Sequence, residues 1–192
     1  PLARARGLRL HIDGARLFNA SVALGSPARE LAGAADSVMF CLSKGLSAPV
    51  GSMLCGSRAF IEEARRYRKQ VGGAMRQVGV LAAAGIVALE VMVDRLAEDH
   101  ALARALAEGL RRVPGLLLDE GAPLTNMVYF SLAPSVKLTD SAFVDRLRDR
   151  GVLVLLDEPR RFRLVTHAWI SREDIPRAVG AIRDVIEQGE PS

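Results

Sequence analysis

Short apolar runs alternate with amphipathic segments through the first half of the chain. Residues 37–42 (SVMFCL) are apolar almost throughout, which is typical of a strand buried on both faces of a parallel sheet. Residues 8–13 and 52–55 are two further strand-like runs, each closed by a glycine. Apolar residues at helical spacing predict helices at 29–34, 59–69 and 78–113. This alternation predicts part of a mostly parallel α/β sheet.

The last third of the chain has a different pattern. It contains two amphipathic segments and three short strand-like runs, so it resembles a small α+β unit. The predicted helices are 141–150 and 172–187, and the predicted strands are 127–132, 152–155 and 162–166. A helix as long as 78–113 usually links two packing units, and we therefore expect two domains, residues 1–95 and residues 96–192.

Composition narrows the class of protein. The chain has 192 residues, of which 49% are hydrophobic and 25% charged, and this excludes disordered, collagen-like and coiled-coil proteins. With 26 basic and 22 acidic side chains the net charge is +4, but the bases are spread among the acids and aromatic residues make up only 5%. We therefore do not expect a nucleic-acid partner. No apolar run approaches the roughly 20 residues that span a bilayer, so no membrane partner is expected.

The two cysteines, Cys41 and Cys55, both lie inside apolar runs. Their spacing matches no zinc pattern, and no metal site is expected. Buried free thiols indicate a reducing, cytoplasmic setting.

Two candidate chemical groups follow the ends of predicted strands. Asp13 ends the first strand, with Arg16 three residues later, and Lys44 follows the strand 37–42. In open α/β sheets, ligands bind beyond the carboxyl ends of the strands. A lysine can become a neutral nucleophile whereas an arginine cannot, and an acid with an amine in one crevice suits pyridoxal phosphate. Spacing alone favours a surface lysine and a strand-end aspartate that caps the following amides, because both residue types are common at loop tips.

Several long motifs resemble the low-specificity L-threonine aldolases, which belong to the aspartate-aminotransferase-like, fold type I group of pyridoxal-phosphate enzymes. The resemblance implies the same fold, with residues 1–95 as the latter part of the cofactor-binding large domain and 96–192 as the small C-terminal domain. The motifs are HIDGARLFNA (11–20), SVMFCLSKGLSAPVGSMLCG (37–56), GGAMRQVGVLAAAG (72–85), MVDRLAEDH (92–100), LTNMV (124–128) and FRLVTH (162–167).

The resemblance implies four cofactor contacts. Lys44 would be the Schiff-base lysine, Asp13 the partner of the pyridine nitrogen, and Ser43 a neighbour of the cofactor. Arg76 would reach across a dimer interface to the cofactor phosphate of the neighbouring subunit. Arg76 could equally be the solvated start of the long helix.

The resemblance also implies two groups that bind the substrate carboxylate, Arg16 and Arg163. Two guanidinium groups can fix a carboxylate through paired hydrogen bonds. Arg163 alternates with apolar neighbours, so it could instead lie on the outer face of a strand. His11, His167 and Asn126 are interpreted as packing or structural groups.

The implied activity is cleavage of L-threonine or L-allo-threonine to glycine and acetaldehyde, in a homodimer or homotetramer with shared active sites. Family members are nearly twice this long, and the phosphate loop and the ring-stacking histidine would precede Pro1. We therefore expect the chain to be the C-terminal portion of such an enzyme. Another fold type I lyase, a transaminase or a fragment without activity of its own remain alternatives.

Overall fold

The computed structural model describes residues 2–121 and 123–189. The chain divides into two compact units, residues 1–96 and 97–192. The division falls inside the long helix α5 (Gly79–Arg111), one residue from the boundary expected from the sequence. The role of each unit as a large or small domain stays a prediction. No helix within the described residues combines the length and apolarity needed to cross a bilayer.

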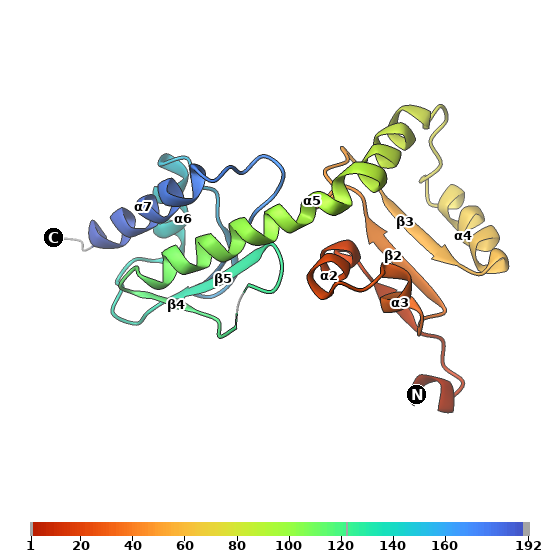
Figure 1. The fold of residues 1–192 in the computed structure, drawn as a ribbon, viewed down its shortest axis with the longest axis horizontal. Coiled ribbons are helices and arrows are strands. Elements are labelled where there is room, and N and C mark those ends of the chain that lie inside the picture. Colours follow the sequence, from red (N-terminus) through yellow and green to blue (C-terminus); the bar gives the residue numbers. More distant parts are fainter. Residues whose placement is uncertain (1, 122, 190–192) are drawn as a thin grey trace. The chain divides into compact units, whose positions relative to one another are not determined.

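The first unit is built on a three-stranded sheet with the order β1-β2-β3. Strand β1 pairs with β2 in parallel, and β2 pairs with β3 antiparallel. The elements are α1 (Leu2–Ala5), β1 (His11–Asp13), α2 (Leu17–Leu24), α3 (Ala28–Ala32), β2 (Ser37–Cys41), β3 (Ser52–Gly56), α4 (Arg58–Gln70) and the first part of α5 (Figure 1).

The core of the first unit is small. Five of its described hydrophobic residues form one buried cluster: Leu42, Leu46, Ala48, Ala88 and Leu96. Phe18 on α2 packs edge-on against Phe40 on β2, with the ring centroids 5.1 Å apart, because β2 turns this face toward the helix. Strand β2 is only half-buried and β3 is exposed along its whole length. The expectation that residues 37–42 form a strand buried on both faces is therefore wrong among the described residues.

The second unit is an antiparallel sheet with the order β4-β5-β7-β6. Its helices α6 and α7 and the second part of α5 supply the other layer (Figure 1). The remaining elements are β4 (Leu116–Leu118), β5 (Met127–Leu132), α6 (Asp140–Asp149), β6 (Leu155–Glu158), β7 (Arg161–Val165) and α7 (Asp174–Glu187).

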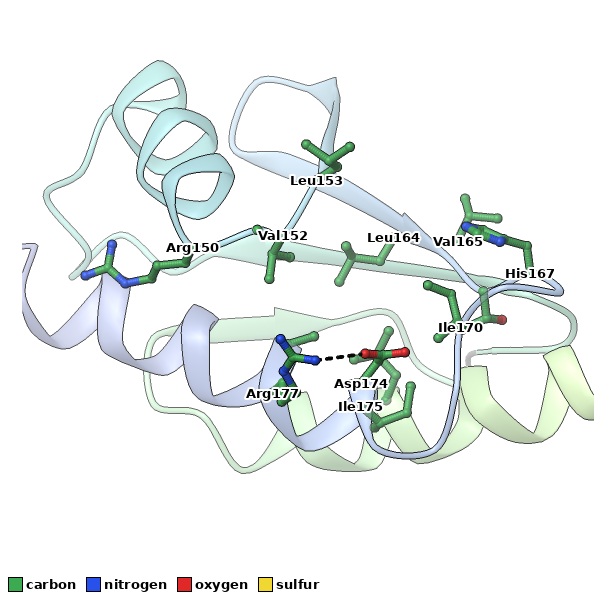
Figure 2. Close-up of a pocket in the computed structure, with 14 residues that line it drawn as sticks. Arg150, Val152, Leu153, Leu164, Val165, His167, Ile170, Asp174, Ile175 and Arg177 are labelled. Carbon is green, nitrogen blue, oxygen red and sulfur yellow. Dashed lines mark hydrogen bonds and ion pairs between the residues drawn. The ribbon is translucent and has the colours of Figure 1, made fainter.

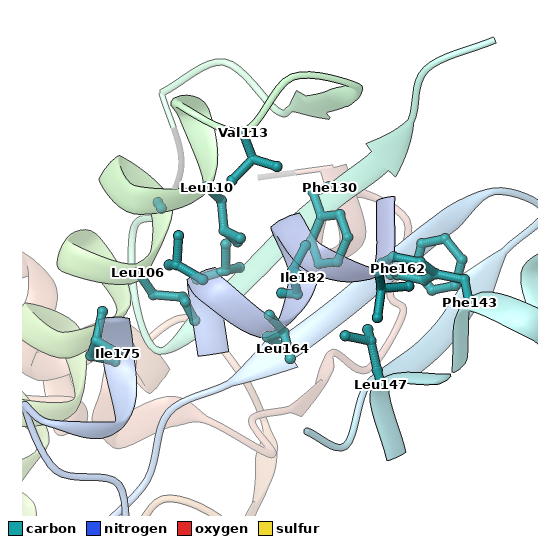
Figure 3. Packing of buried hydrophobic residues seen from close by; sticks show 14 of the residues in the cluster. Leu106, Leu110, Val113, Phe130, Phe143, Leu147, Phe162, Leu164, Ile175 and Ile182 are labelled. Atoms are coloured by element: carbon teal, nitrogen blue, oxygen red, sulfur yellow. The ribbon is translucent and has the colours of Figure 1, made fainter. Parts of the chain in front are cut away.

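The two central strands of this sheet, β5 and β7, each bury one face. Buried and half-buried residues alternate along β5 and β7, as the period of two in a strand requires. Phe162 stacks on Phe130 at 5.7 Å and lies 4.8 Å from Phe143 of α6, measured between ring centroids. Figure 3 shows these aromatic rings together with Ile182 and Leu110. Eighteen buried hydrophobic residues form this cluster among the residues described.

Several elements differ from the sequence-based expectation. Helix α2 and strand β4 were not expected, and the strand expected at 152–155 is β6, at Leu155–Glu158. Val152 and Val154 instead pack against the core from an irregular segment. The strand expected at 8–13 begins only at His11. Directly before it, the Leu10 N–H donates to the Asp36 carboxylate at 2.8 Å and the Leu10 carbonyl accepts from the Asp36 N–H at 2.8 Å.

Candidate active site

Asp13 is fixed at the carboxyl end of β1. Its Oδ1 accepts a hydrogen bond from the Ala15 N–H at 3.1 Å, and the Gly14 N–H donates to the Met39 carbonyl of β2 at 2.9 Å. A Cβ on Gly14 would lie 2.8 Å from that same carbonyl oxygen, so only glycine fits this approach. The strand therefore ends in a tight turn, with the Asp13 side chain exposed beside it.

Lys44 lies in the loop that follows β2, and the backbone of this loop is tied down. The Leu42 N–H donates to the Gly51 carbonyl at 2.9 Å and the Ala48 N–H to the Leu42 carbonyl at 3.0 Å. The Ser47 N–H donates to the Lys44 carbonyl at 2.9 Å. The Lys44 side chain is exposed on this anchored base.

Asn19 lies close to Gly45 in the loop that contains Lys44. It is a buried polar residue of α2, 3% exposed, and its side-chain atoms lie 3.0 and 3.5 Å from the position that a Cβ on Gly45 would take. The sequence analysis missed Asn19. The signal was present, since a polar residue interrupts the otherwise apolar run LFNASVAL.

The first unit brings four of the predicted site residues to one edge of its sheet. Because β1 and β2 are parallel neighbours, with Asp13 opposite Met39, their carboxyl ends lie at the same edge. Asp13 ends β1, and Ser43 and Lys44 follow β2. Arg16 directly precedes α2 and is half-buried.

Arg76 is positioned differently. It lies in a turn directly before α5, inside a stretch in which every residue from 71 to 80 is exposed. The next residue, Gln77, has a φ of 50°, an uncommon value for a residue other than glycine. Arg76 is thus an exposed residue outside the buried cluster of its own unit.

Arg163 belongs to β7 of the second unit. Its neighbours Phe162 and Leu164 enter the core, so Arg163 lies on the opposite face of the strand, where it is half-buried. The Arg163 Nε atom is buried and has no hydrogen-bonding partner among the described residues. A buried guanidinium nitrogen without a partner is costly, and an anion such as a carboxylate would satisfy it.

The histidines and Asn126 make contacts that accompany the fold. His11 shares a 2.8 Å hydrogen bond between its Nδ1 and the Ser37 Oγ on β2. Asn126 is buried, and its amide donates to the Thr166 carbonyl at 2.8 Å, which ties the start of β5 to the end of β7. His167 accepts a hydrogen bond from the Trp169 N–H at 3.3 Å.

The residues at this edge fit pyridoxal phosphate. An exposed primary amine and an exposed carboxylate, on fixed backbone after neighbouring parallel strands, are the groups that hold such a cofactor by its aldehyde and by its ring nitrogen. The bonds that fix the loop around Lys44 are between backbone groups, and at Asp13 the Ala15 N–H occupies one carboxylate oxygen, Oδ1, so that Oδ2 remains for a ligand.

Comparison with known proteins identifies curated relatives. Over all 192 residues the chain is 44% identical to the low-specificity L-threonine aldolase 1 of Arabidopsis thaliana, of which it covers 54%. It is 45% identical over 172 residues to the low specificity L-threonine aldolase of Escherichia coli O157:H7, covering 90% of this chain and 49% of that protein. The chain thus spans about half the length of the curated relatives it matches.

Solved structures share the fold. A provisionally named aromatic amino acid beta-eliminating lyase/threonine aldolase from Exiguobacterium sp. 255-15 matches with a TM-score of 0.78 and 24% identity, over 95% of this chain and 54% of that one. The threonine aldolase of Leishmania major matches with a TM-score of 0.70 and 19% identity, over 96% and 54%. These matches confirm the expected fold, that of part of a fold type I pyridoxal-phosphate enzyme. The beta-eliminating lyase family model matches residues 1–133, and the chain belongs to this family.

Proposed function

We propose that the protein containing this chain cleaves L-threonine or L-allo-threonine to glycine and acetaldehyde with pyridoxal phosphate as cofactor. One observation carries the proposal: Asp13 and Lys44 follow the carboxyl ends of the parallel neighbours β1 and β2. The threonine aldolases among the relatives give the reaction its substrate class. When bound, the cofactor withdraws electrons from the α-carbon of an amino acid, which permits the Cα–Cβ bond to break.

In this proposal each residue of the first unit has one task. The Lys44 amine would hold the cofactor through its aldehyde group. The Asp13 carboxylate keeps the ring nitrogen protonated by pairing with its proton. Ser43 lies beside the cofactor, next to the lysine. Arg76, on its exposed turn, contacts the cofactor phosphate of a neighbouring subunit.

Arg16 and Arg163 bind the substrate carboxylate in the proposal. The unsatisfied Nε of Arg163 supports this task, because a carboxylate oxygen would provide its missing acceptor. Binding at the carboxylate also fixes the orientation of the substrate, and in cofactor enzymes of this kind the orientation selects which bond at the α-carbon breaks.

The proposed neighbouring subunit is a second copy in a homodimer or homotetramer. Helix α5 exposes four apolar side chains on its first half, Val80, Ile86, Val87 and Val91, each more than half exposed. An apolar surface of this kind is typical of an interface between subunits. We expect Val87→Glu to shift the mass measured by light scattering toward the monomer. An unchanged monomeric mass in both proteins would contradict the proposed assembly. The free thiols of Cys41 and Cys55 support a cytoplasmic setting, although the expectation that both are buried is wrong, since Cys41 is half-buried and Cys55 is exposed.

The test uses the full-length protein loaded with pyridoxal phosphate. Aldehyde and glycine are measured after addition of L-threonine or L-allo-threonine, and Lys44→Ala is expected to abolish both products. Lys69→Ala is the matched control, because Lys69 is an exposed lysine in the last turn of α4. Absence of aldehyde from either substrate, despite bound cofactor, would overturn the proposal.

A second candidate reaction is β-elimination, which the name of the matched family favours. The products separate the candidates, since elimination gives an α-keto acid and ammonia, and transamination exchanges an amino group. For the 192-residue chain alone we propose weak cofactor binding and little activity, because it spans about half of its relatives.

A further inference from the structure

A cavity of about 330 Å³ in the second unit takes no part in the proposed reaction. It lies between the end of β7, the first turn of α7 and the segment that joins α6 to β6 (Figure 2). All the residues that line it belong to the second unit, and none has a task in the proposed reaction. The volume is at the lower end of the range of small-molecule sites, roughly 300–1,000 Å³.

The floor of the cavity is apolar. Leu106 of α5, Leu164 of β7 and Ile175 of α7 line it, and each is less than 10% exposed. Leu164 and Arg163 are consecutive residues of one strand, so their side chains lie on opposite faces of the sheet. Arg163 itself is not among the residues that line the cavity.

An acid and a base stand together at the mouth of the cavity. The Arg177 Nη1 lies 3.4 Å from the Asp174 Oδ1, and Figure 2 shows the two side chains facing each other. The guanidinium is well exposed, with 82% of its side chain accessible, so this pair is weak. Both charges are therefore available to a ligand.

The Asp174 carboxylate is held in place on its other oxygen. Oδ2 accepts hydrogen bonds from the Ser171 N–H at 2.9 Å and from the Ser171 hydroxyl at 2.8 Å. These bonds hold the pKa of Asp174 below its usual value, so the group is ionised at neutral pH. Oδ1 accepts a long hydrogen bond from Arg177 Nη1 at 3.4 Å, and a carboxylate oxygen can accept a second one from a ligand.

Arg150 also lines the cavity, but its guanidinium is already engaged. It donates to the Arg146 carbonyl and to the Gln188 side chain at the far end of α7. Arg177 is thus the arginine whose charge is available at the mouth within the part of the chain that the structure describes.

We propose that this cavity binds a free α-amino acid with a branched apolar side chain, at a site separate from the reaction site. The ammonium group meets the Asp174 Oδ1, the carboxylate meets Arg177, and the side chain covers Leu106, Leu164 and Ile175. A simple carboxylic acid leaves Asp174 uncompensated, and a simple amine leaves Arg177 uncompensated. The inference stands on the cavity alone and does not require the proposed reaction.

Trp169 provides the measurement. It is the single tryptophan of the chain, and it lies in the loop between His167 and Ile170, which both line the cavity. We expect L-leucine to give a saturable change in Trp169 fluorescence in the full chain, accompanied by heat in a calorimetric titration. The analogues 4-methylpentanoate and 3-methylbutylamine, each lacking one charge, are expected to bind about tenfold more weakly.

Three variants locate the binding. Arg177→Ala is expected to weaken leucine binding about tenfold, whereas Arg172→Ala, an exposed neighbour outside the cavity, leaves it unchanged. Ala178→Phe fills the cavity and is expected to abolish binding; its circular dichroism spectrum checks that the fold is retained. Lys44→Ala is expected to bind leucine as the parent does.

Two results would overturn the inference. One is the absence of both saturable fluorescence and heat. The other is leucine binding that disappears in Lys44→Ala and persists in Arg177→Ala, because the ligand would then occupy the reaction site. Failure of the aldolase assay affects neither result, so the two proposals fail separately.

Discussion

The two units bury apolar residues to very different extents. In the second unit a cluster of eighteen buried hydrophobic residues lies between an antiparallel sheet and three helices, whereas the cluster in the first unit has five. Strands β5 and β7 each bury one complete face, but β3 exposes every residue, including Met53 and Leu54. The unit that carries Asp13 and Lys44 is therefore the one with the smaller core of its own.

The difference between the two units shows that a site can be locally ordered even when the unit that contains it has a small core. The backbone around Asp13 and Lys44 is fixed by short-range hydrogen bonds, which need no large core. The stability of a domain depends instead on the apolar surface it buries. The apolar strands of the first unit present more such surface than its own described residues cover.

The largest difference is expected when the two units are expressed separately and their unfolding is compared. Residues 97–192 are expected to unfold in one cooperative transition, because their core is nearly closed. Residues 1–96 are expected to show no cooperative transition, because five buried residues cannot offset the entropy of ordering the chain. Urea titration followed by circular dichroism measures both. A sharp transition in residues 1–96 would remove the contrast.

Substitution of Arg160 measures how much hydrogen bonding contributes to the stability of the second unit. Its guanidinium donates to the carbonyls of Leu132, Ala133, Val136 and Leu138 at 2.7–3.4 Å. We expect Arg160→Ala to lower the free energy of unfolding by about 2–4 kcal/mol, since these half-buried carbonyls lose their donor.

The control for Arg160 is Arg161→Ala, which removes ion pairs with Asp119 at 2.7 Å and Asp157 at 3.8 Å and the contact of the guanidinium with the Tyr129 ring. These contacts are partly exposed to solvent, and their loss is expected to cost about 1 kcal/mol. Equal losses in the two variants, measured by urea titration, would show that the four carbonyls are satisfied without Arg160.

Two glycine-to-alanine substitutions should change the free energy of unfolding in opposite directions. Gly14→Ala places a Cβ 2.8 Å from a backbone oxygen of β2, and we expect it to cost about 1–3 kcal/mol in the first unit. Gly180→Ala, in α7, meets no atom within 4 Å and is expected to stabilise the second unit by about 0.5–1 kcal/mol. Thermal unfolding of both variants gives the signs, and stabilisation by Gly14→Ala would refute the close approach of β1 to β2.

The smallest expected effect is on the dependence of stability on pH. Burial lowers the pKa of His100 below 6.5, so the unfolded state takes up a proton first and the second unit loses stability as the pH falls below about 6.5. The Leu10 N–H and then the Arg9 guanidinium lower the pKa of Asp36 below 3.8. That contribution to the first unit is complete above 3.8 and is lost only as the pH falls through the lower folded value.

His100→Gln should therefore remove the earlier loss of stability and Asp36→Asn the later one, both measured by urea titration across pH 3–8. If His100→Gln leaves the pH dependence above pH 5 unchanged, burial does not control the protonation of this histidine.

The sequence predicted the long elements because their apolar residues repeat over several turns. Helices α4 and α5 lie within two residues of the expected bounds, and β5 matches the expected range. Helix α2 was missed because its eight residues are too few and too uniformly apolar to show a helical period. Strand β6 was displaced by three residues, because Val152 and Val154 bury their side chains without pairing in the ladder.

The candidate site divides in the same way. The positions of Asp13 and Lys44 can be predicted from local signals. Each follows or ends an apolar run that is closed by a glycine, and such a pattern is visible in the sequence. The support beneath Gly45 by Asn19, and the four carbonyls that Arg160 joins, depend on contacts between distant segments. No local pattern encodes such contacts, so the structure was needed to find them.

The anchored loop after β2 also has an entropic consequence. A mobile loop would lose roughly 1–2 kcal/mol of backbone entropy for each residue that a bound ligand immobilises. In the loop around Lys44, the amides of Leu42, Ser47 and Ala48 are already hydrogen-bonded, so that loss has occurred on folding. A ligand that captures the amine then restricts only the rotors of one side chain, at about 2 kcal/mol. Slow hydrogen exchange at these three amides, before any ligand is added, would be the signature of this preorganisation.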